Sequence, residues 1–143
     1  MVRADAPDTE TLVRAFVDRT LHKAQWTHDA HLRVGLWHVR AFGEAGAVER
    51  LRVRIRRYNE AVGTPNTDTS GYHETLTVFY VRLIAAFLEA GHWRDGGASP
   101  DAEALLLAQL GDRTLPLEYY SRERLFSPEA RRAWVAPDLR SLP

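Results

Sequence analysis

Histidine is the residue type in this chain whose spacing most suggests chemistry. Three of the six histidines, His28, His31 and His38, recur along one predicted helix over residues 28–42. At about 100° per residue their rings share one arc with Gly35, on the face expected to be buried. Neutral imidazole binds Zn, Fe, Cu and Ni, and His28 and His31 have the i, i+3 spacing of a helical ligand pair. A glycine inside a helix costs about 1 kcal/mol relative to alanine, which indicates that space is needed beside these rings.

Further polar residues are expected at the same end of the molecule. His73 is predicted in the first turn of a later helix, on its apolar face, with Glu74 next to it. Asn59 lies near the end of the preceding helix. In an up-down order the second and fourth helices run parallel, so their N-termini meet the C-terminal end of the third. The residues expected to converge there are His28, His31, His73, Glu74 and Asn59, with His22 close by.

This convergence predicts a divalent-metal site. The expected ligands of Zn, Fe, Ni or Mn are His28, His31 and His73. His38 lies about 10 Å deeper along the helix, where it either hydrogen-bonds to the site or replaces His28 as a ligand. Three protein ligands leave a position open for water or substrate, with Glu74 or Asn59 as base or substrate contact. A metal-dependent hydrolase or lyase acting on a small molecule is the favoured function, and Fe(II) would turn the chemistry to oxygen activation.

Three alternatives stay open. The first is a metal-free acid–base enzyme in which His73 and Glu74 act together at the mouth of the bundle. The second is a small-ligand-binding protein with a cavity beside Gly35, including haem with His31 or His38 as axial ligand. In the third, each histidine serves the fold alone, bonded to a protein partner.

The elements that must position these residues are predicted to be helices. Apolar residues recur at three- and four-residue spacing, without the alternation typical of strands. Capping residues and glycines set the boundaries. Helices are expected from Asp8 or Thr9 to near Lys23, from Thr27 to Phe42, from Ala47 to Val62, from the end of the polar loop 64–70 to Gly91, from Ser99 to Gly111, and from Ser127 onwards. We predict an all-α fold, a four-helix up-down bundle core with a C-terminal extension of short helices.

The composition of the chain limits the number of domains, the kinds of site and the partners that are expected. A chain of 143 residues suits one helical domain over residues 1–143, and the absence of cysteine excludes disulfides and thiolate ligands. Net charge is zero and the arginines of the run 50–57 spread around their helix, so nucleic acid is not an expected partner. The longest apolar stretch is too short to cross a bilayer and the first residues do not form a signal peptide. These features predict a cytoplasmic protein without a membrane partner.

Two large apolar residues are expected on outward helix faces. Trp37 and Val53 would be covered either by the C-terminal extension or by a second subunit. We expect a homodimer.

Strings in the middle of the chain carry a resemblance. They are Thr27-His28-Asp29-Ala30-His31-Leu32-Arg33, Tyr58-Asn59-Glu60, Asn66-Thr67 and Gly71-Tyr72-His73-Glu74-Thr75. Over roughly residues 26–80 they resemble a family of small uncharacterised bacterial helical proteins, a resemblance that implies no activity. A looser analogy is to the DinB-type helical bundles, which hold a divalent metal with three histidines. The H-x-x-x-H spacing on the last helix of those bundles is absent here.

Overall fold

The computed structural model describes residues 8–92 and 100–143, and the regular secondary structure of these residues is helical. The helices are α1 (Thr9–Val17), η1 (Lys23–Gln25), α2 (His28–Ala61), α3 (Glu74–Phe87), η2 (Leu88–His92), α4 (Pro100–Leu110), η3 (Leu115–Glu118), α5 (Arg122–Leu125) and α6 (Pro128–Arg132). An isolated bridge pairs Thr67 with Ser70 in the polar loop, and the described residues form no strand. The predicted all-α class is confirmed.

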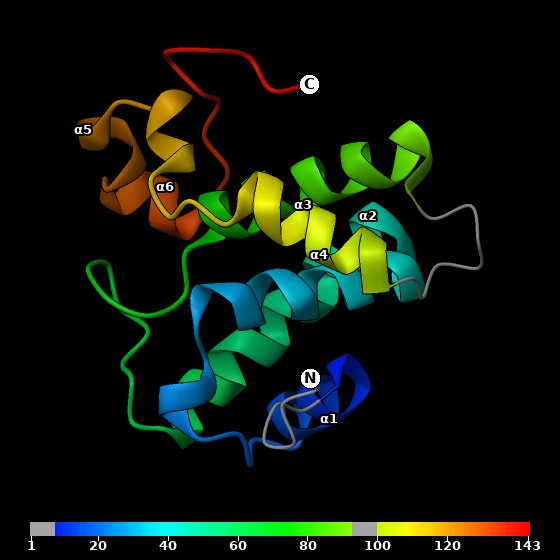
Figure 1. Cartoon of the computed structure of the whole chain (residues 1–143). Coiled ribbons are helices and arrows are strands. Elements are labelled where there is room, and N and C mark those ends of the chain that lie inside the picture. Colours follow the sequence, from blue (N-terminus) through cyan, green and yellow to red (C-terminus); the bar gives the residue numbers. More distant parts are fainter. Residues whose placement is uncertain (1–7, 93–99) are drawn as a thin grey trace.

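Helix α2 is a hairpin of two limbs. Gly43 breaks it with φ 74° and ψ 177°, a conformation open essentially to glycine alone. The first limb covers residues 28–42 and the second limb covers residues 44–61. Nη1 of Arg54 lies 2.8 Å from Nε2 of His38, whereas a straight helix would separate these positions by about 24 Å. The predicted break at Gly43 is therefore confirmed, and Figure 1 shows the chain reversing there.

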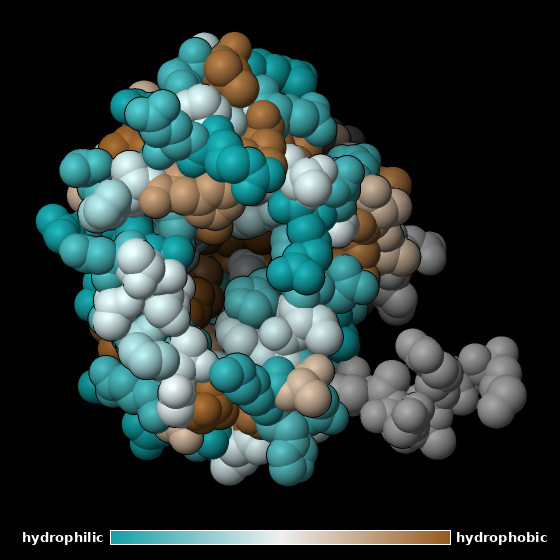
Figure 2. Space-filling model, turned by 90° about the vertical axis from the view of Figure 1, so that its left-hand side faces the viewer, coloured by the Kyte–Doolittle hydropathy of each residue, from teal (hydrophilic) through white to brown (hydrophobic). Residues whose placement is uncertain are grey.

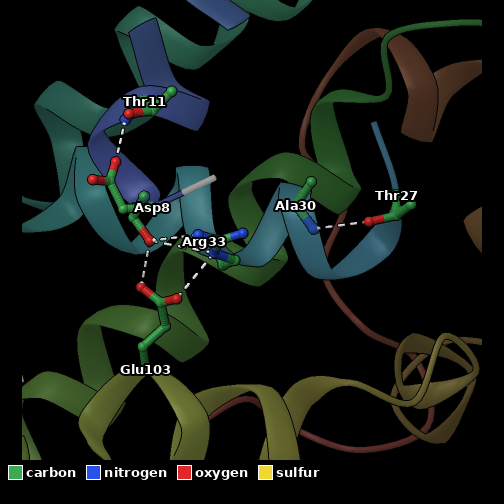
Figure 3. Close-up of polar contacts among 7 residues, drawn as sticks. Asp8, Thr11, Thr27, Ala30, Arg33 and Glu103 are labelled. Carbon is green, nitrogen blue, oxygen red and sulfur yellow. Dashed lines mark hydrogen bonds and ion pairs between the residues drawn. The ribbon is translucent and has the colours of Figure 1, made fainter. Parts of the chain in front are cut away.

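Side chains cap the helices and tie them together (Figure 3). Asp8 and Thr27 each accept a hydrogen bond from the backbone N–H three residues on, at 2.7 Å and 3.2 Å. Nε of Arg33, on the first limb, donates to one oxygen of Glu103 in α4 at 2.9 Å. The hydroxyl of Thr9 donates to the other oxygen at 2.6 Å. One carboxylate thus joins α1, α2 and α4.

The second limb ends at a glycine, as predicted. Gly63 has φ 79°, and its N–H donates to the carbonyl of Glu60 at 3.2 Å. The N–H of Thr64 donates to the carbonyl of Asn59 at 2.8 Å. This pair of bonds is the Schellman motif, which satisfies the last helical carbonyls.

Two helices are shorter than predicted. α1 ends at Val17 and not near Lys23, because Arg19 takes φ 63° and turns the chain. α3 begins only at Glu74. It is followed by the π-helical turn η2, where Gly91 has φ 100°.

The helices pack mainly around α2 (Figure 1). α1, α3 and α4 each contact α2, while α6 packs against α3. Their shared core includes Phe16, Leu36, Tyr58, Phe79 and Ile84. Ser127 caps α6, which confirms the short helix predicted there, whereas the cap predicted at Ser99 lies outside the described residues. Within the described ranges, the helices are too short or too polar to cross a membrane.

Candidate ligand-binding cavity

A cavity of about 930 Å³ lies between the N-terminal ends of α2 and α3. Figure 2 looks at this end and shows a deep recess with hydrophobic atoms inside and hydrophilic residues around it. Its apolar wall includes Leu32, Leu51, Ile55, Leu76 and Ile84. The predicted site residues in the wall are His28, His31, His73 and Asn59, together with Gly35. The volume falls in the range of small-molecule sites.

His31 is held by a ring stack and one hydrogen bond. Its ring stacks on Trp26 with centroids 3.7 Å apart, and Nδ1 lies 2.7 Å from the carbonyl of Thr27. A carbonyl only accepts, so Nδ1 carries the proton and Nε2 keeps its lone pair. The ring retains accessible surface in the cavity wall, but the surrounding protein desolvates it. This burial outweighs the Thr27 bond and lowers the pKa of His31 from 6.5 to about 4, so the ring is neutral at pH 7.

His28 lies one turn earlier and has the opposite tautomer. Its Nε2 is 3.2 Å from the carbonyl of Leu110, at the end of α4, and must be the donor. The edge of the ring contacts Tyr80, with centroids 5.4 Å apart. In the neutral form of the ring Nδ1 is thus the nitrogen with the lone pair, and it has no partner in the described part of the chain.

His73 is the N-cap of α3 and not a residue of its first turn. Nδ1 accepts from the N–H of Leu76 at 3.1 Å, which fixes the proton on Nε2. Nε2 then donates to the carbonyl of Leu125 at 2.8 Å. Burial lowers the pKa of His73, and the Leu125 bond opposes this without reversing it. Both ring nitrogens are used by the protein itself.

His38 is fully buried and does not line the cavity. Nε2 accepts from Arg54, a side chain that only donates, so Nδ1 carries the proton and donates to the carbonyl of Val34 at 2.8 Å. Burial lowers the pKa of His38 to about 4 against the Val34 bond, and the charge of Arg54 adds to the decrease. His38 joins the two limbs of α2.

The predicted metal site is not supported by the described residues. Among them, no group of three or more His, Asp or Glu side chains is placed to hold a metal ion. His73 and His38 have no free lone pair, which leaves His28 and His31, fewer than the three ligands of a catalytic metal site. His38 is also excluded as a haem ligand in the cavity, since it lies outside the wall.

Glu74 does not line the cavity either. Arg52 binds it through two parallel hydrogen bonds of 3.0 Å and 2.6 Å, and the hydroxyl of Tyr72 donates to it at 2.7 Å. Burial alone would raise the pKa of Glu74, but the bonds from Arg52 and Tyr72 leave it below its usual value. The carboxylate is thus ionised and bonded to Arg52 and Tyr72 outside the cavity wall, and its predicted role as a base stays a prediction.

Asn59 lines the cavity and is anchored through the polar loop. Its Nδ2 donates to Oδ1 of Asn66 at 3.0 Å, and the same oxygen accepts from the N–H of Tyr72 at 2.9 Å. Nδ2 of Asn66 in turn donates to the carbonyl of Arg56 at 3.1 Å. Gly71 has φ 79°, and an added Cβ would lie 2.4 Å from the carbonyl oxygen of Pro65. The loop is therefore held by several hydrogen bonds, and Thr64 and Gly71 at its two ends line the cavity.

Gly35 lets α3 approach the first limb. A Cβ there would lie 3.0 Å from Cδ1 of Ile84, tighter than ordinary contact. Gly35 and Ile84 are both buried and both line the cavity. The space indicated by the glycine is thus filled in part by Ile84.

Most arginines of the run 50–57 contact other side chains of the molecule. Besides the bonds of Arg52 and Arg54, Arg50 stacks over the ring of Phe42 at 3.9 Å and Arg56 over that of Tyr72 at 5.0 Å. Four of the five arginines of the run thus contact other side chains of the molecule, while Arg57 is exposed.

Several cavity residues escaped prediction. Trp26 is one that a local signal could have revealed, because it precedes the cap Thr27 and packs on His31, the pattern of a hydrophobic staple. The contact of Tyr80 with His28 also escaped prediction, because helical periodicity does not indicate it. Lys23 and Arg113, both exposed, carry no pattern that indicates a site.

Comparison of the chain with protein-family models, with curated proteins and with solved structures gives no match. The resemblances noted from the sequence therefore stay predictions.

Proposed function

We propose that this protein binds a small, largely apolar organic molecule in the cavity between the N-terminal ends of α2 and α3. The observation that carries the proposal is a space of about 930 Å³ with an apolar wall and a few polar groups. Such a combination is characteristic of small-molecule sites, where apolar surface supplies affinity and polar groups supply orientation. The proposal corresponds to the second alternative left open by the sequence, a small-ligand-binding protein, but it does not include haem.

The proposal gives the histidines a role that needs no metal. His28 and His31 each keep one lone pair, which suits hydrogen bonds to an organic ligand. An acid–base pair of His73 and Glu74 is less well supported, because Glu74 lies outside the wall and His73 has both nitrogens bonded.

The proposal also includes the predicted helix order. We propose that α1, the first and second limbs of α2 and α3 form an up-down bundle, in which the first limb and α3 run parallel. The hairpin at Gly43 and the contacts of α1 and α3 with α2 support this order. The cavity lies at the end where the first limb and α3 both begin.

Calorimetry with 8-anilinonaphthalene-1-sulfonate tests the proposal. We expect saturable binding of about one molecule per chain. Leu76→Trp extends an indole from the cavity wall and should reduce the affinity at least tenfold. Val53→Trp adds the same group at an exposed position outside the wall and should bind like the wild type. Unchanged binding by Leu76→Trp, or absence of saturable binding by the wild type, would reject the cavity as the site.

A further inference from the structure

We infer that the cavity selects molecules that carry O–H or N–H donors, because three residues of its wall each keep an unpaired hydrogen-bond acceptor. The inference rests on the proposed function and names the class of its ligand. The three atoms are Nδ1 of His28, Nε2 of His31 and Oδ1 of Asn59.

The two histidines are fixed as acceptors by partners that only accept. The carbonyl of Leu110 requires a proton on Nε2 of His28, and the carbonyl of Thr27 requires one on Nδ1 of His31. A neutral imidazole carries one proton, so the other nitrogen of each ring is a lone pair. His28 and His31 differ in tautomer, but each offers a ligand one hydrogen-bond acceptor.

Asn59 is fixed as an acceptor through Asn66. The backbone N–H of Tyr72 only donates, so the Asn66 atom that it contacts must be the oxygen. The Asn59 atom that contacts the same oxygen must then be the NH₂ group. The carbonyl of Arg56, which only accepts, holds Asn66 in this orientation from its other side. Oδ1 of Asn59 makes no hydrogen bond within the described part of the chain and is left for a molecule in the cavity.

The other uncharged polar groups of the wall are bonded to the protein, either donate or accept, or only donate, as the indole N–H of Trp26 does. His73 has both nitrogens bonded, and the hydroxyls of Tyr72 and Thr77 donate to protein acceptors. Tyr80 and Thr64 have hydroxyls that either donate or accept. Three charged residues also line the cavity, Lys23, Asp29 and Arg113, and all three are exposed.

These features define a ligand class. An aromatic or other apolar body suits the wall formed by Leu32, Ile55 and Ile84. Two hydroxyl or N–H groups on that body would satisfy two of the three acceptors. A ligand with only ether or carbonyl oxygens would leave its own lone pairs facing those of the wall, and buried groups left unpaired lower affinity.

A matched pair of probes tests the inference. Naphthalene-2,7-diol carries two donors, and 2,7-dimethoxynaphthalene has the same body without donors. We expect calorimetry to show about tenfold tighter binding of the diol, as two hydrogen bonds of ordinary net strength give. His31→Phe keeps a ring for the Trp26 stack but removes the acceptor, so it should bring the two affinities within about threefold. His22→Phe, an exposed histidine outside the wall, should keep the tenfold preference.

The outcomes separate the two proposals. Equal binding of diol and dimethyl ether by the wild type would overturn the acceptor inference and leave the binding cavity standing. If neither probe nor the anilinonaphthalene dye binds, both proposals fail. A preference that survives in His31→Phe and in His28→Phe, each checked for folding by its thermal transition, also overturns the inference.

Discussion

Burial keeps His38 neutral, and its two partners, the carbonyl of Val34 and the guanidinium of Arg54, fix its tautomer. Protonation would place a hydrogen on Nε2, against the guanidinium of Arg54 at 2.8 Å. The pKa of His38 in the folded chain is about 4, below its ordinary value of 6.5, so the unfolded chain binds the proton first as pH falls. The contribution of the neutral His38 ring to the free energy of unfolding is therefore fully present above pH 6.5. It is lost as the pH falls from 6.5 to about 4.

The size of this effect can be predicted. A pKa that falls from 6.5 to about 4 corresponds to about 3 kcal/mol of unfolding free energy for a fully buried ring. Urea unfolding at pH 7 and at pH 4.5 should show the decrease in the wild type. His38→Phe removes the titrating ring, so its stability should depend less steeply on pH. Parallel pH profiles for the two proteins would contradict a neutral His38.

Glu74 gives a second prediction at the residue scale. Glu74→Gln weakens both bonds from Arg52, so we expect a loss of about 1–3 kcal/mol in unfolding free energy. Binding of naphthalene-2,7-diol should stay within about twofold, because Glu74 does not line the cavity. Glu60→Gln, at an exposed position on the same hairpin, is the control and should change neither quantity. Loss of binding in Glu74→Gln alone would support the role that the sequence predicts for this residue.

The sequence predicts the place of the histidines better than their chemistry. His28, His31 and His73 all line one cavity, as expected from helical periodicity and the proposed helix order. Their partners could not be predicted, because the carbonyls of Leu110 and Leu125 belong to segments that no local pattern pairs with them. Periodicity says which side of a helix a ring occupies, whereas a ring's tautomer depends on tertiary contacts.

At the scale of elements, two glycines end helical limbs by different conformations. Gly63 has the left-handed φ of a Schellman motif, which asparagine also tolerates. Gly43 combines φ 74° with ψ 177°, a region that asparagine does not favour. A Cβ at either position meets no atom within 4 Å, so a substitution tests the backbone conformation alone.

This difference makes a prediction about the hairpin. Gly43→Asn should lower the unfolding free energy by about 1–3 kcal/mol. Gly63→Asn should lower it by less than 1 kcal/mol, since Asn adopts positive φ at helix ends. Thermal or urea unfolding of the two variants, side by side, measures both. Equal losses would show that the unusual ψ at Gly43 does not strain the hairpin.

Helix ends marked by standard residues were predictable, and others were not. Thr27, Gly63 and Ser127 end or begin helices where the sequence indicates. His73 is an uncommon cap, so the start of α3 was predicted too early. The left-handed Arg19, which ends α1, is similarly unmarked, because arginine shows no preference for positive φ.

At the scale of the whole molecule, the C-terminal segment holds the cavity wall in place. Nη1 of Arg131 donates to the carbonyls of Gly71 and Tyr72 at 3.0 Å and 3.4 Å, and the hydroxyl of Thr75 donates to the carbonyl of Ala133 at 2.9 Å. Arg132 also pairs with Asp68, but both side chains of that ion pair are largely exposed.

Two neighbouring arginines should therefore differ in importance. Arg131→Ala leaves carbonyls of the loop without their donor and should cost about 1–3 kcal/mol and speed amide exchange in residues 66–73. Arg132→Ala removes an exposed pair and should cost less than 1 kcal/mol. Hydrogen exchange followed by mass spectrometry measures the loop directly. Equal protection in both variants would mean that α6 does not hold the loop.

A homodimer stays a prediction. Trp37 is half-buried and packs edge-on against His38 and Phe42, while Val53 remains 45% exposed. Light scattering at high concentration tests it, and a monomer there would overturn it.

The hydrogen bonds that close the cavity also bear on how the protein folds. His28 and Leu110 are 82 positions apart, and His73 and Leu125 are 52 apart. Contacts so distant along the chain form slowly, because the intervening segment must lose much of its freedom first. The hairpin of α2, by contrast, needs contacts over only 16 positions. During refolding, far-UV circular dichroism should thus recover before binding of naphthalene-2,7-diol does, and a ligand that recognises the finished cavity would stabilise only the last state to form.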